Sequence, residues 1–523
     1  MYKLSFCVVI ILLLTGLYAQ SQTIYHMGLT MDDEEYRKAP HASENIQLED
    51  GRRSMQSEAD LSAYCPEIRF QGEIASCVGW SLGYGAMTME RAMKNGWTDQ
   101  GVISENANSA LFIYNQISRG ECQKGISLVS AMELLQDKGN CLAKEFDFDV
   151  NDCNRNVPEK LLQKASDYRI ADYIRLFPLD AEPEEKIKRI RLVLAQNKPV
   201  VVGMKVLQNF YDIRKGDETW WPKFGNTTYA GGHAMVIVGY DDNKYRHPTQ
   251  KMPPEERGAF KLMNSWGKNW GNNGFIWIRY GDFANYCRYA FTLMLEEGAP
   301  IQLDSMPQTT DQVAEHTEAP DPEPSVRELV RMAGSFGFRQ YTGWEYGPVF
   351  KEAGVEAEGS EYRLQGDWKI GDQFQLYTKS DFDNGYIYVL SIDPQRKAQV
   401  HFPRSEEYNN KFEDENESAL IITGGSVLTI PNQESVLKLS RPGMEHLVVL
   451  FSTKKIKADY IKILGVELAK HKDNLIRHLH TMLDRFMVPL SDITYQKDQM
   501  GFEVSTRSEG KIVPIVLTVK VSG

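Results

Sequence analysis

A cysteine opens a stretch of this 523-residue chain that is both apolar at helical spacing and rich in glycine, "CVGWSLGYGAMTMERAM". Apolar residues recur on one face, which predicts a buried helix from about residue 77 to 94, ending near Gly96. Gly79, Gly83 and Gly85 each cost about 1 kcal/mol of helix propensity relative to alanine. We therefore expect this helix to pack closely against neighbouring backbone.

The position of Cys77 at the start of that helix favours its thiolate form. Unpaired backbone N–H groups and the positive end of the helix dipole face the sulfur there and lower the pKa of a thiol. Ser76 is a candidate N-cap residue. Alone, a cysteine of an exported protein is more often half of a disulfide, so a catalytic interpretation requires partner residues.

The N-terminus indicates export. Residues 1–19 contain one lysine, then an apolar run from Leu4 to Leu17, and then small and polar residues, which is the layout of a secretory signal peptide. No other run approaches the ~18 apolar residues of a membrane span, so we expect no stable membrane span after signal removal and a secreted, periplasmic or cell-surface protein. The net charge of −12 without a basic block argues against nucleic acid as a partner.

Six cysteines would remain after export, and an oxidising compartment favours pairing of most of them. If Cys77 stays free, five are left, so at most two disulfides form and one thiol is spare. Their connectivity does not follow from the sequence. Cys287 is the most isolated and is our candidate for the unpaired thiol.

Composition divides the chain once. Residues 296–325 are rich in proline and acidic residues, which predicts a linker. It separates a domain at 56–295, preceded by a short N-terminal segment at 20–55, from a β-rich domain at 326–523. The 56–295 part shows helices at about 77–94, 127–138 and 183–196, followed by strand-rich segments "PVVVGMKV", "HAMVIVGYDD", "GAFKLMNSWG" and "GFIWIRYG". This order is typical of an α+β fold.

Two further motifs accompany the cysteine. "AGGHAMVIVGY" places His233 at the head of an apolar strand, and "KLMNSWGKNWGNNGFIWI" places Asn264 at the end of another. With "QGEIASC" they occur in the order found in papain-like cysteine peptidases, which residues from about 60 to 295 resemble. The matching residues are Gln71, Gly72, Ser76, Cys77, His233, Ala234, Val238, Gly239, Tyr240, Asn264, Ser265, Trp266, Gly267, Trp270 and Gly271.

The resemblance implies a two-lobed fold, a helical lobe plus a β-barrel-like lobe, and a set of catalytic roles. Cys77 would be the nucleophile and His233 the proton shuttle. Asn264 would orient the imidazole, and Trp266 would shield that hydrogen bond. Gln71, with the backbone N–H of Cys77, would stabilise the oxyanion. Substrates would be proteins or peptides, and neither a cofactor nor a metal is implied.

Some positions depart from the family pattern. The glycine-rich segment that pairs with substrate is represented weakly by "CQKG", so Gly125 and Gly232 are our candidate substrate-binding glycines. The 20–55 segment is too short for a separate inhibitory domain. Two alternatives to a peptidase stay open: a peptidase-fold protein that binds without cleaving, and an enzyme that transfers the acyl group to an amine.

The C-terminal part resembles an uncharacterised β-rich domain of bacterial exported and envelope proteins. The matches are Gly385 to Val389, Phe402-Pro403, Ile430-Pro431 and Pro442 to Leu447. We expect a β-sandwich with a hairpin around Asp383-Asn384-Gly385, followed by one amphipathic helix through Leu468, Leu475 and Phe486. His471, His478 and His480 cannot all converge on that helix, so we predict no metal site there. The domain would bind an envelope or protein partner, and the chain would be bacterial.

Overall fold

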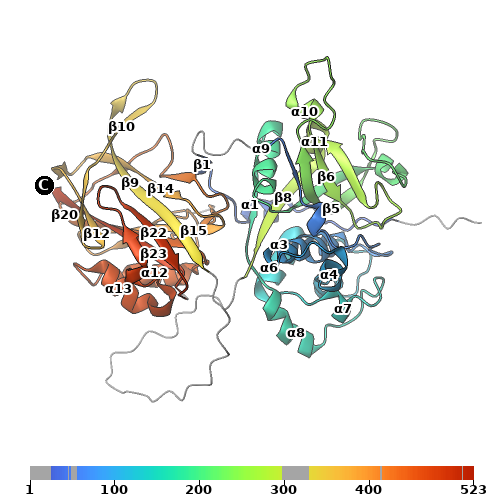
Figure 1. The fold of residues 1–523 in the computed structure, drawn as a ribbon, viewed down its shortest axis with the longest axis horizontal. Helices are drawn as coiled ribbons and strands as arrows, with labels where there is room; N and C mark the ends of the chain where they lie inside the picture. The colour runs from blue at the N-terminus through green and yellow to red at the C-terminus, as the bar shows by residue number, and fades with distance from the viewer. Residues whose placement is uncertain (1–24, 45, 49–55, 297–328, 413–414, 509) are drawn as a thin grey trace, which may run out of the picture.

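The computed structural model describes residues 25–44, 46–48, 56–296, 329–412, 415–508 and 510–523, which form two parts along the long axis of the molecule (Figure 1). The expected signal peptide and the linker, apart from Glu296, lie outside the described residues. Within the described ranges, no helix combines the length and apolar character needed to cross a bilayer.

The first lobe of the 56–295 domain is helical. The helix expected over 77–94 is present, but its middle is π-helical. It consists of α2 (Cys77–Gly79), η2 (Trp80–Met87) and α3 (Thr88–Lys94). Around it lie η1 (Ser62–Tyr64), α4 (Gln100–Glu105), α5 (Leu111–Ser118), α6 (Leu128–Asp137), α7 (Ala143–Phe146), α8 (Glu159–Ala165) and η3 (Ser166–Tyr168).

The glycines of this central helix give the close packing expected from the sequence. A methyl group on Gly79 would overlap the carbonyl oxygen of Ala110, and one on Gly83 would overlap that of Ser109. Gly85 faces the other lobe, where a methyl group would lie 2.8 Å from a Val236 side-chain carbon. The absent side chains therefore let the helix lie directly against backbone on one side and against the sheet on the other.

The second lobe is a mixed layer of sheet and helix. Its strands pair in the order β3-β8-β4-β5-β6-β7, with β2 beside β5. The first and last strands of this order do not pair with each other within the described residues. The sheet is therefore open, whereas the expected barrel-like lobe would come close to a closed sheet. The elements are β2 (Glu58–Asp60), β3 (Ile170–Arg175), α9 (Pro183–Leu194), β4 (Val200–Leu207), η4 (Gln208–Asp212), β5 (Tyr229–Asp241), α10 (Pro254–Arg257), β6 (Ala259–Met263), β7 (Phe275–Arg279), α11 (Tyr280–Tyr286) and β8 (Cys287–Leu295).

The C-terminal part is a sandwich of two sheets around an apolar core. One sheet has the order β1-β18-β14-β9-β22-β21, with β10 and β19 at its margins. The other has the order β11-β12-β23-β20-β15-β16, with β13 and β17. The strands are β9 (Val330–Trp344), β10 (Pro348–Glu352), β11 (Val355–Glu358), β12 (Glu361–Leu364), β13 (Trp368–Lys369), β14 (Gln373–Ser380), β15 (Gly385–Ile392), β16 (Ala398–Phe402), β17 (Leu420–Ile421), β18 (Ser426–Ile430), β19 (Leu437–Lys438), β20 (Gly443–Ser452), β21 (Ile493–Tyr495), β22 (Gly501–Thr506) and β23 (Ile512–Ser522).

The hairpin expected around Asp383-Asn384-Gly385 is wrong. The strands on either side of this turn, β14 and β15, belong to different sheets. Every residue of β15 is buried, so this strand needs cover on both faces. The sandwich core covers one face of β15, and the helices cover the other. In the sheet that contains β14, the strand would lack the cover of the helices.

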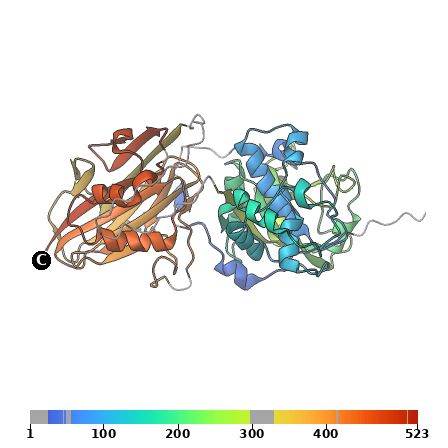
Figure 2. The same cartoon turned by 90° about the horizontal axis from the view of Figure 1, so that it is seen from below.

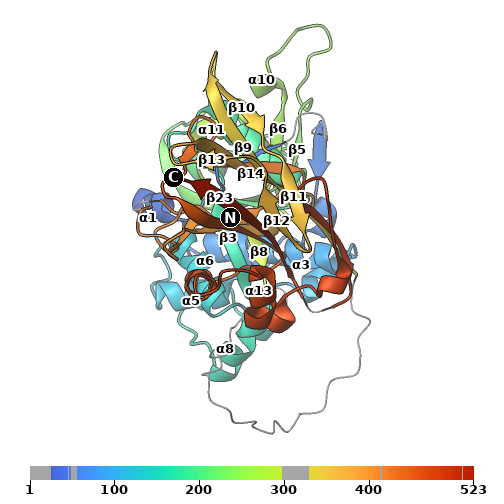
Figure 3. The same cartoon turned by 90° about the vertical axis from the view of Figure 1, so that its left-hand side faces the viewer.

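The expected C-terminal helix is two helices. Leu468 ends α12 (Ala458–Leu468), and Leu475 begins α13 (Leu475–Leu483), because the chain turns through Asn474 in a left-handed conformation at φ 53°. η5 (Asp484–Phe486) and η6 (Leu490–Asp492) follow. Figure 2 shows α12 and α13 lying over one sheet of the sandwich. The hairpin of β9 and β10 extends from the sandwich in Figure 3.

The N-terminal segment, residues 25–48, touches both parts of the molecule. It crosses the two lobes of the 56–295 domain, forms α1 (Asp33–Lys38) and ends in β1 (Ile46–Leu48), which pairs with β18 of the C-terminal sandwich (Figure 1). It does not form a domain of its own, in line with its length.

We predict that Gly79→Ala destabilises the protein by about 1–3 kcal/mol, because overpacking against the Ala110 carbonyl outweighs the gain of about 1 kcal/mol in helix propensity. Urea unfolding measures the change. Gly101→Ala, on the exposed helix α4, is the matched control and should be near neutral. Equal effects of the two substitutions would contradict the packing role of Gly79.

Candidate active site

Cys77 is the first residue of α2 and is completely buried. Its sulfur accepts hydrogen bonds from the backbone N–H groups of Gly28 (3.2 Å) and Ala234 (3.4 Å). Ser76 stands at the N-cap position, but its hydroxyl makes no capping bond and has no partner among the described residues. The predicted N-cap position of Ser76 is confirmed, but its side chain does not cap the helix.

His233 and Asn264 meet because β5 and β6 pair side by side. Asn264 directly follows β6, and its Oδ1 lies 2.8 Å from His233 Nε2. The other ring nitrogen, Nδ1, has no hydrogen-bond partner in the described part of the chain. The next residue, Ala234, donates its backbone N–H to the Cys77 sulfur, and no hydrogen bond joins that sulfur to the imidazole among the described residues. The asparagine thus occupies one nitrogen and leaves Nδ1 to exchange a proton.

Trp266 covers this pair with an aromatic stack. Its ring lies 4.9 Å from that of His233. On its own faces it stacks with Tyr25 at 4.6 Å and with Tyr211 at 5.5 Å between centroids. The indole is only 2% exposed. Water therefore has little access to the bond between His233 and Asn264.

Three hydrogen bonds fix the side-chain amide of Gln71. Its Oε1 accepts from the Ser265 hydroxyl (2.7 Å), and its Nε2 donates to the carbonyl of Ile74 (3.0 Å). The second N–H of the same amide donates to the carbonyl oxygen of His26 (3.1 Å). Without His26, this N–H would be available to a carbonyl oxygen of a substrate.

Residues 25–31 of the N-terminal segment lie between Gly232 and Ile126, and we call the space that they fill the cleft. Leu29 donates its N–H to the carbonyl of Gly232 (3.1 Å), and Ile126 donates to the carbonyl of Gly28 (2.9 Å). Gly232 thus binds peptide backbone. On the opposite wall, Ile126 forms the backbone bond, and a methyl group on the adjacent Gly125 would lie 3.0 Å from the Gly28 carbonyl oxygen.

This segment is bound in a way that does not present a bond for attack. The group that faces the sulfur is the N–H of Gly28, whereas attack requires a carbonyl carbon about 3–3.5 Å from the nucleophile. Gly28 must also lack a side chain, since a methyl group there would overlap the carbonyl oxygen of Ala75. In this position the segment covers the sulfur without presenting a carbonyl carbon to it.

Burial under the segment shifts both titrating groups toward their neutral forms. It raises the pKa of the Cys77 thiol to about 11, although the N–H groups of Ala234 and Gly28 act in the opposite direction. Burial also lowers the pKa of His233 to about 4, although the hydrogen bond that the ring makes to Asn264 Oδ1 acts in the opposite direction. Near pH 7 the covered site therefore holds a thiol and a neutral imidazole instead of a reactive ion pair.

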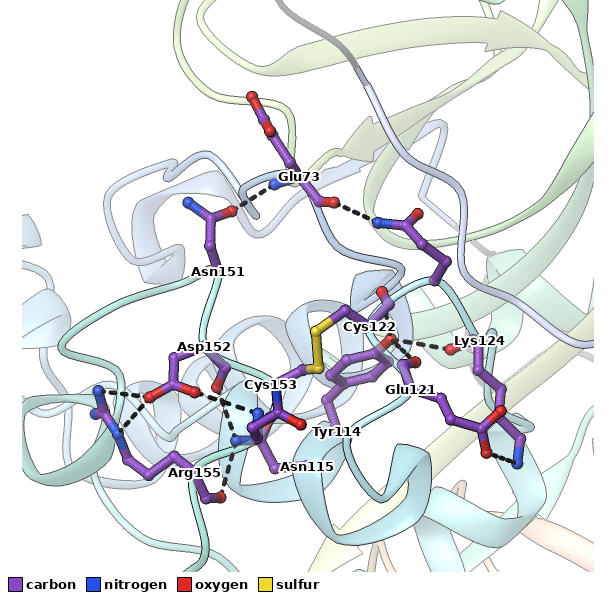
Figure 4. The surroundings of a disulfide bond; sticks show 12 residues. Glu73, Tyr114, Asn115, Glu121, Cys122, Lys124, Asn151, Asp152, Cys153 and Arg155 are labelled. Carbon is purple, nitrogen blue, oxygen red and sulfur yellow. Dashed lines mark hydrogen bonds and ion pairs between the residues drawn. A yellow bond between two sulfur atoms is a disulfide. The ribbon is translucent and has the colours of Figure 1, made fainter.

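A disulfide braces the wall of the cleft. Cys122 and Cys153 link the loop before Gly125 to the loop at 149–155 (Figure 4). The Cys122 carbonyl accepts from Ala75 N–H (2.9 Å), and Asn151 Oδ1 accepts from Glu73 N–H (2.6 Å). Both loops thereby hold the stretch that leads into Cys77.

The other described cysteines besides Cys77 are unpaired and buried: Cys65, Cys141 and Cys287. Cys287 is free as expected. The expectation that most of the cysteines pair is wrong, because Cys65 and Cys141 fill apolar cores as small hydrophobic residues do.

Sequence reasoning missed the cleft contacts of residues 25–31 and of Tyr211. The glycine of "YHMGLTM" is the only local signal. Gly28 packs against Ala75, 47 positions away, and Leu29 bonds Gly232, 203 positions away. Pairing over such separations leaves no periodic pattern.

Comparison with known proteins assigns families to two parts of the chain. Residues 56–295 match the model of the papain family of cysteine proteases, and residues 367–455 match a domain of unknown function, DUF4384. Over 220 residues the chain is 24% identical to an uncharacterised peptidase C1-like protein of Acanthamoeba polyphaga mimivirus, covering 40% of this chain and 63% of that protein. It is 22% identical over 234 residues to cathepsin J of Mus musculus, covering 43% of this chain and 60% of that protein.

The chain therefore spans less than two thirds of the length of these two relatives. Among solved structures, xylellain, a cysteine protease from Xylella fastidiosa, is 20% identical with a TM-score of 0.41, covering 53% of this chain and 97% of that one.

We predict that Gly28→Ala uncovers Cys77, because the added methyl group has no space beneath the segment. Iodoacetamide should alkylate Cys77 faster in this variant at pH 7, as mapped by mass spectrometry. In the parent chain, the raised thiol pKa should make the rate climb steadily from pH 7 to pH 10. Thr30→Ala, at an exposed position of the same segment, is the control. Equal alkylation rates in all three proteins would contradict the segment's role as a cover.

Proposed function

Residues 56–295 belong to the papain family of cysteine proteases, and we propose on this basis that the chain is an exported thiol peptidase that hydrolyses peptide bonds through an acyl-enzyme on Cys77. The observation that carries the proposal is the extended segment in the cleft. Its backbone binds Gly232 and Ile126 on opposite walls, and its His26 carbonyl binds the amide of Gln71. A cleft that holds extended backbone in this way suits protein or peptide substrates.

Acylation begins once the segment leaves. His233 Nδ1 takes the thiol proton, and the thiolate of Cys77 attacks the substrate carbonyl carbon. The oxygen becomes negatively charged and accepts hydrogen bonds from Gln71 Nε2 and from the Cys77 backbone N–H. The C–N bond then breaks, a thioester remains on Cys77, and the leaving amine takes its proton from His233.

Deacylation uses the same groups with water. His233 removes a proton from a water molecule that attacks the thioester carbon, and the thiol leaves with that proton restored. Asn264 keeps the imidazole oriented through both steps by its 2.8 Å bond to Nε2. Trp266 limits the access of water to that bond.

The same proposal makes the chain latent. The 20–55 segment acts as a pro-segment through its residues 25–31, which lie in the cleft, and it is too short to form an inhibitory domain. Export to the periplasm, the cell surface or the medium of a bacterium is supported by the leader-like residues 1–19 and by the disulfide between Cys122 and Cys153.

The decisive experiment compares Gly28→Ala with Gly28→Ala/Cys77→Ala on a diverse peptide mixture under reducing conditions. We expect cleavage by the first protein and none by the second. Adding Gln71→Ala should lower kcat by roughly 10²–10³, as the loss of one oxyanion donor does.

Folded Gly28→Ala protein that alkylates readily but cleaves nothing would count against a peptidase. Product formation only with an added amine would indicate acyl transfer, and bound but uncut peptide would indicate a binding protein.

The position of Leu29 predicts a preference for an aliphatic substrate side chain. Leu29 is buried, and it lies over Gly203 beside the ring of Tyr289; a methyl group on Gly203 would be 2.8 Å from the leucine Cδ2. In the Gly28→Ala background, Gly203→Val should lower kcat/KM for leucine-containing peptides more than for matched alanine-containing peptides, because it fills this space. Equal losses for both peptide series would place the leucine pocket elsewhere.

A further inference from the structure

The N-terminal segment does not end at the cleft. After α1 it runs between the two parts of the molecule and finishes as a strand of the C-terminal sandwich. We propose that the C-terminal domain is the receptor for this segment, binding residues 38–44 and the strand β1 at 46–48, and so holding residues 25–31 over Cys77. The inference rests on the proposed function for its biological meaning, but the binding site stands on its own contacts.

The first part of this receptor is a loop that pairs with the segment backbone. The Asn416 side-chain amide donates to the carbonyl of Lys38 (2.7 Å), and the Asn416 carbonyl accepts from His41 N–H (3.0 Å). Ser418 N–H donates to the carbonyl of His41 (2.9 Å). Three bonds over four segment residues fix the path of the chain without depending on side-chain identity.

The second part is a buried carboxylate. Glu417 is 2% exposed, and it accepts bonds from Arg404 at 2.9 and 3.1 Å within the C-terminal domain. Its Oε1 also accepts from the Ser43 hydroxyl (2.7 Å). Because Arg404 belongs to the C-terminal domain, the carboxylate is already oriented when Ser43 arrives.

The third part is a sheet edge. β1 pairs antiparallel with β18 in the register Ile46 to Leu428 and Leu48 to Ser426, and Ile46 packs against the sandwich core. Addition of an extended peptide to a sheet edge is a recurrent mode of peptide recognition. In Figure 1, β1 lies with the C-terminal part, apart from the other N-terminal elements.

The catalytic domain holds the other side of the same segment. Arg175 N–H donates to the carbonyl of Pro40 (2.7 Å), and Asp33 of α1 binds Arg288 and the Tyr289 hydroxyl. The two domains also meet directly through Asp172, which is completely buried and binds Lys455 (2.9 Å). The segment is therefore enclosed between two surfaces.

A chain with this arrangement should stay inhibited after a single cut. Residues 49–55, which connect β1 to the catalytic domain, lie outside the described residues, and cutting there would leave residues 25–48 held by both the cleft and the receptor. Two linked attachments raise overall binding by roughly 10²–10⁴-fold over one. Full activation then requires that the C-terminal domain also release the segment.

The test uses the full chain with residues 49–55 replaced by the recognition sequence of a site-specific protease. After cutting, size-exclusion chromatography shows whether the N-terminal fragment stays bound, and a fluorogenic peptide measures activity. The parent should keep the fragment and stay inhibited. Ser43→Ala/Ile46→Asp, which leaves every cleft contact intact, should lose the fragment and gain at least about ten-fold activity, since a second attachment contributes that much or more.

Two further proteins complete the design. Asn416→Ala alters the receptor instead of the segment and should give the same direction of change. Glu44→Ala, at an exposed position of the segment, is the matched control and should behave as the parent does.

Each outcome is decisive. Release of the fragment from the cut parent and from the variants to the same extent would overturn the receptor role, whether or not activity appears. Selective loss of the fragment from the variants supports it, even if no peptide is cleaved. Absence of cleavage from every form, including Gly28→Ala, would instead count against the peptidase.

Discussion

The arrangement of the candidate active site depends on the hydrogen bonds that the backbone N–H groups of Gly28 and Ala234 donate to the Cys77 sulfur. The Ala234 bond ties the sulfur to β5, the strand that carries His233, and His233 in turn bonds Asn264. The Gly28 bond closes the site from the other side. Both are possible only because the helix behind Cys77 is packed against backbone at its glycines, which fixes where its first residue lies.

Local patterns in the sequence predict the framework of the site well. The helix over 77–94 and the strands near His233 and Asn264 have strong periodicity. The position of each site residue relative to its strand can therefore be predicted from the sequence. The same reasoning fails at Asp383-Asn384-Gly385. The turn forms, but a turn signal does not specify which strands pair, and the burial of β15 on both faces decides that.

The contacts of the N-terminal segment were beyond prediction for a different reason. The segment is held by main-chain groups and by residues such as Gly232 and Asn416, which are far away in sequence. Main-chain bonds leave no trace in residue type. The free cysteines Cys65 and Cys141 show the complementary limit, since a compartment can favour disulfides while the fold places thiols in separate apolar cores.

Buried charges explain why the two domain surfaces that enclose the N-terminal segment fit only one arrangement. Asp172 and Glu417 are carboxylates with almost no exposure, and each is satisfied by a cation and a hydroxyl. Removing one partner of such a pair is costly because it leaves a charge uncompensated in a dry environment. Closure of the C-terminal domain over the segment therefore favours a complete set of contacts over a partial one.

This requirement explains why the proposed inhibition involves a long part of the N-terminal segment and a second domain. Fixing the backbone of one residue costs about 1–2 kcal/mol, which is similar to the net contribution of about 1 kcal/mol from one hydrogen bond. A short peptide in the cleft thus gains little from its backbone bonds alone. The six residues of α1 are also too few to form a stable helix in isolation. Tyr36, buried in the catalytic domain, and β1, added to the sandwich, supply the further anchoring. A protein without a large inhibitory domain can stay latent if a second domain, distant in sequence, completes the hold on a short segment.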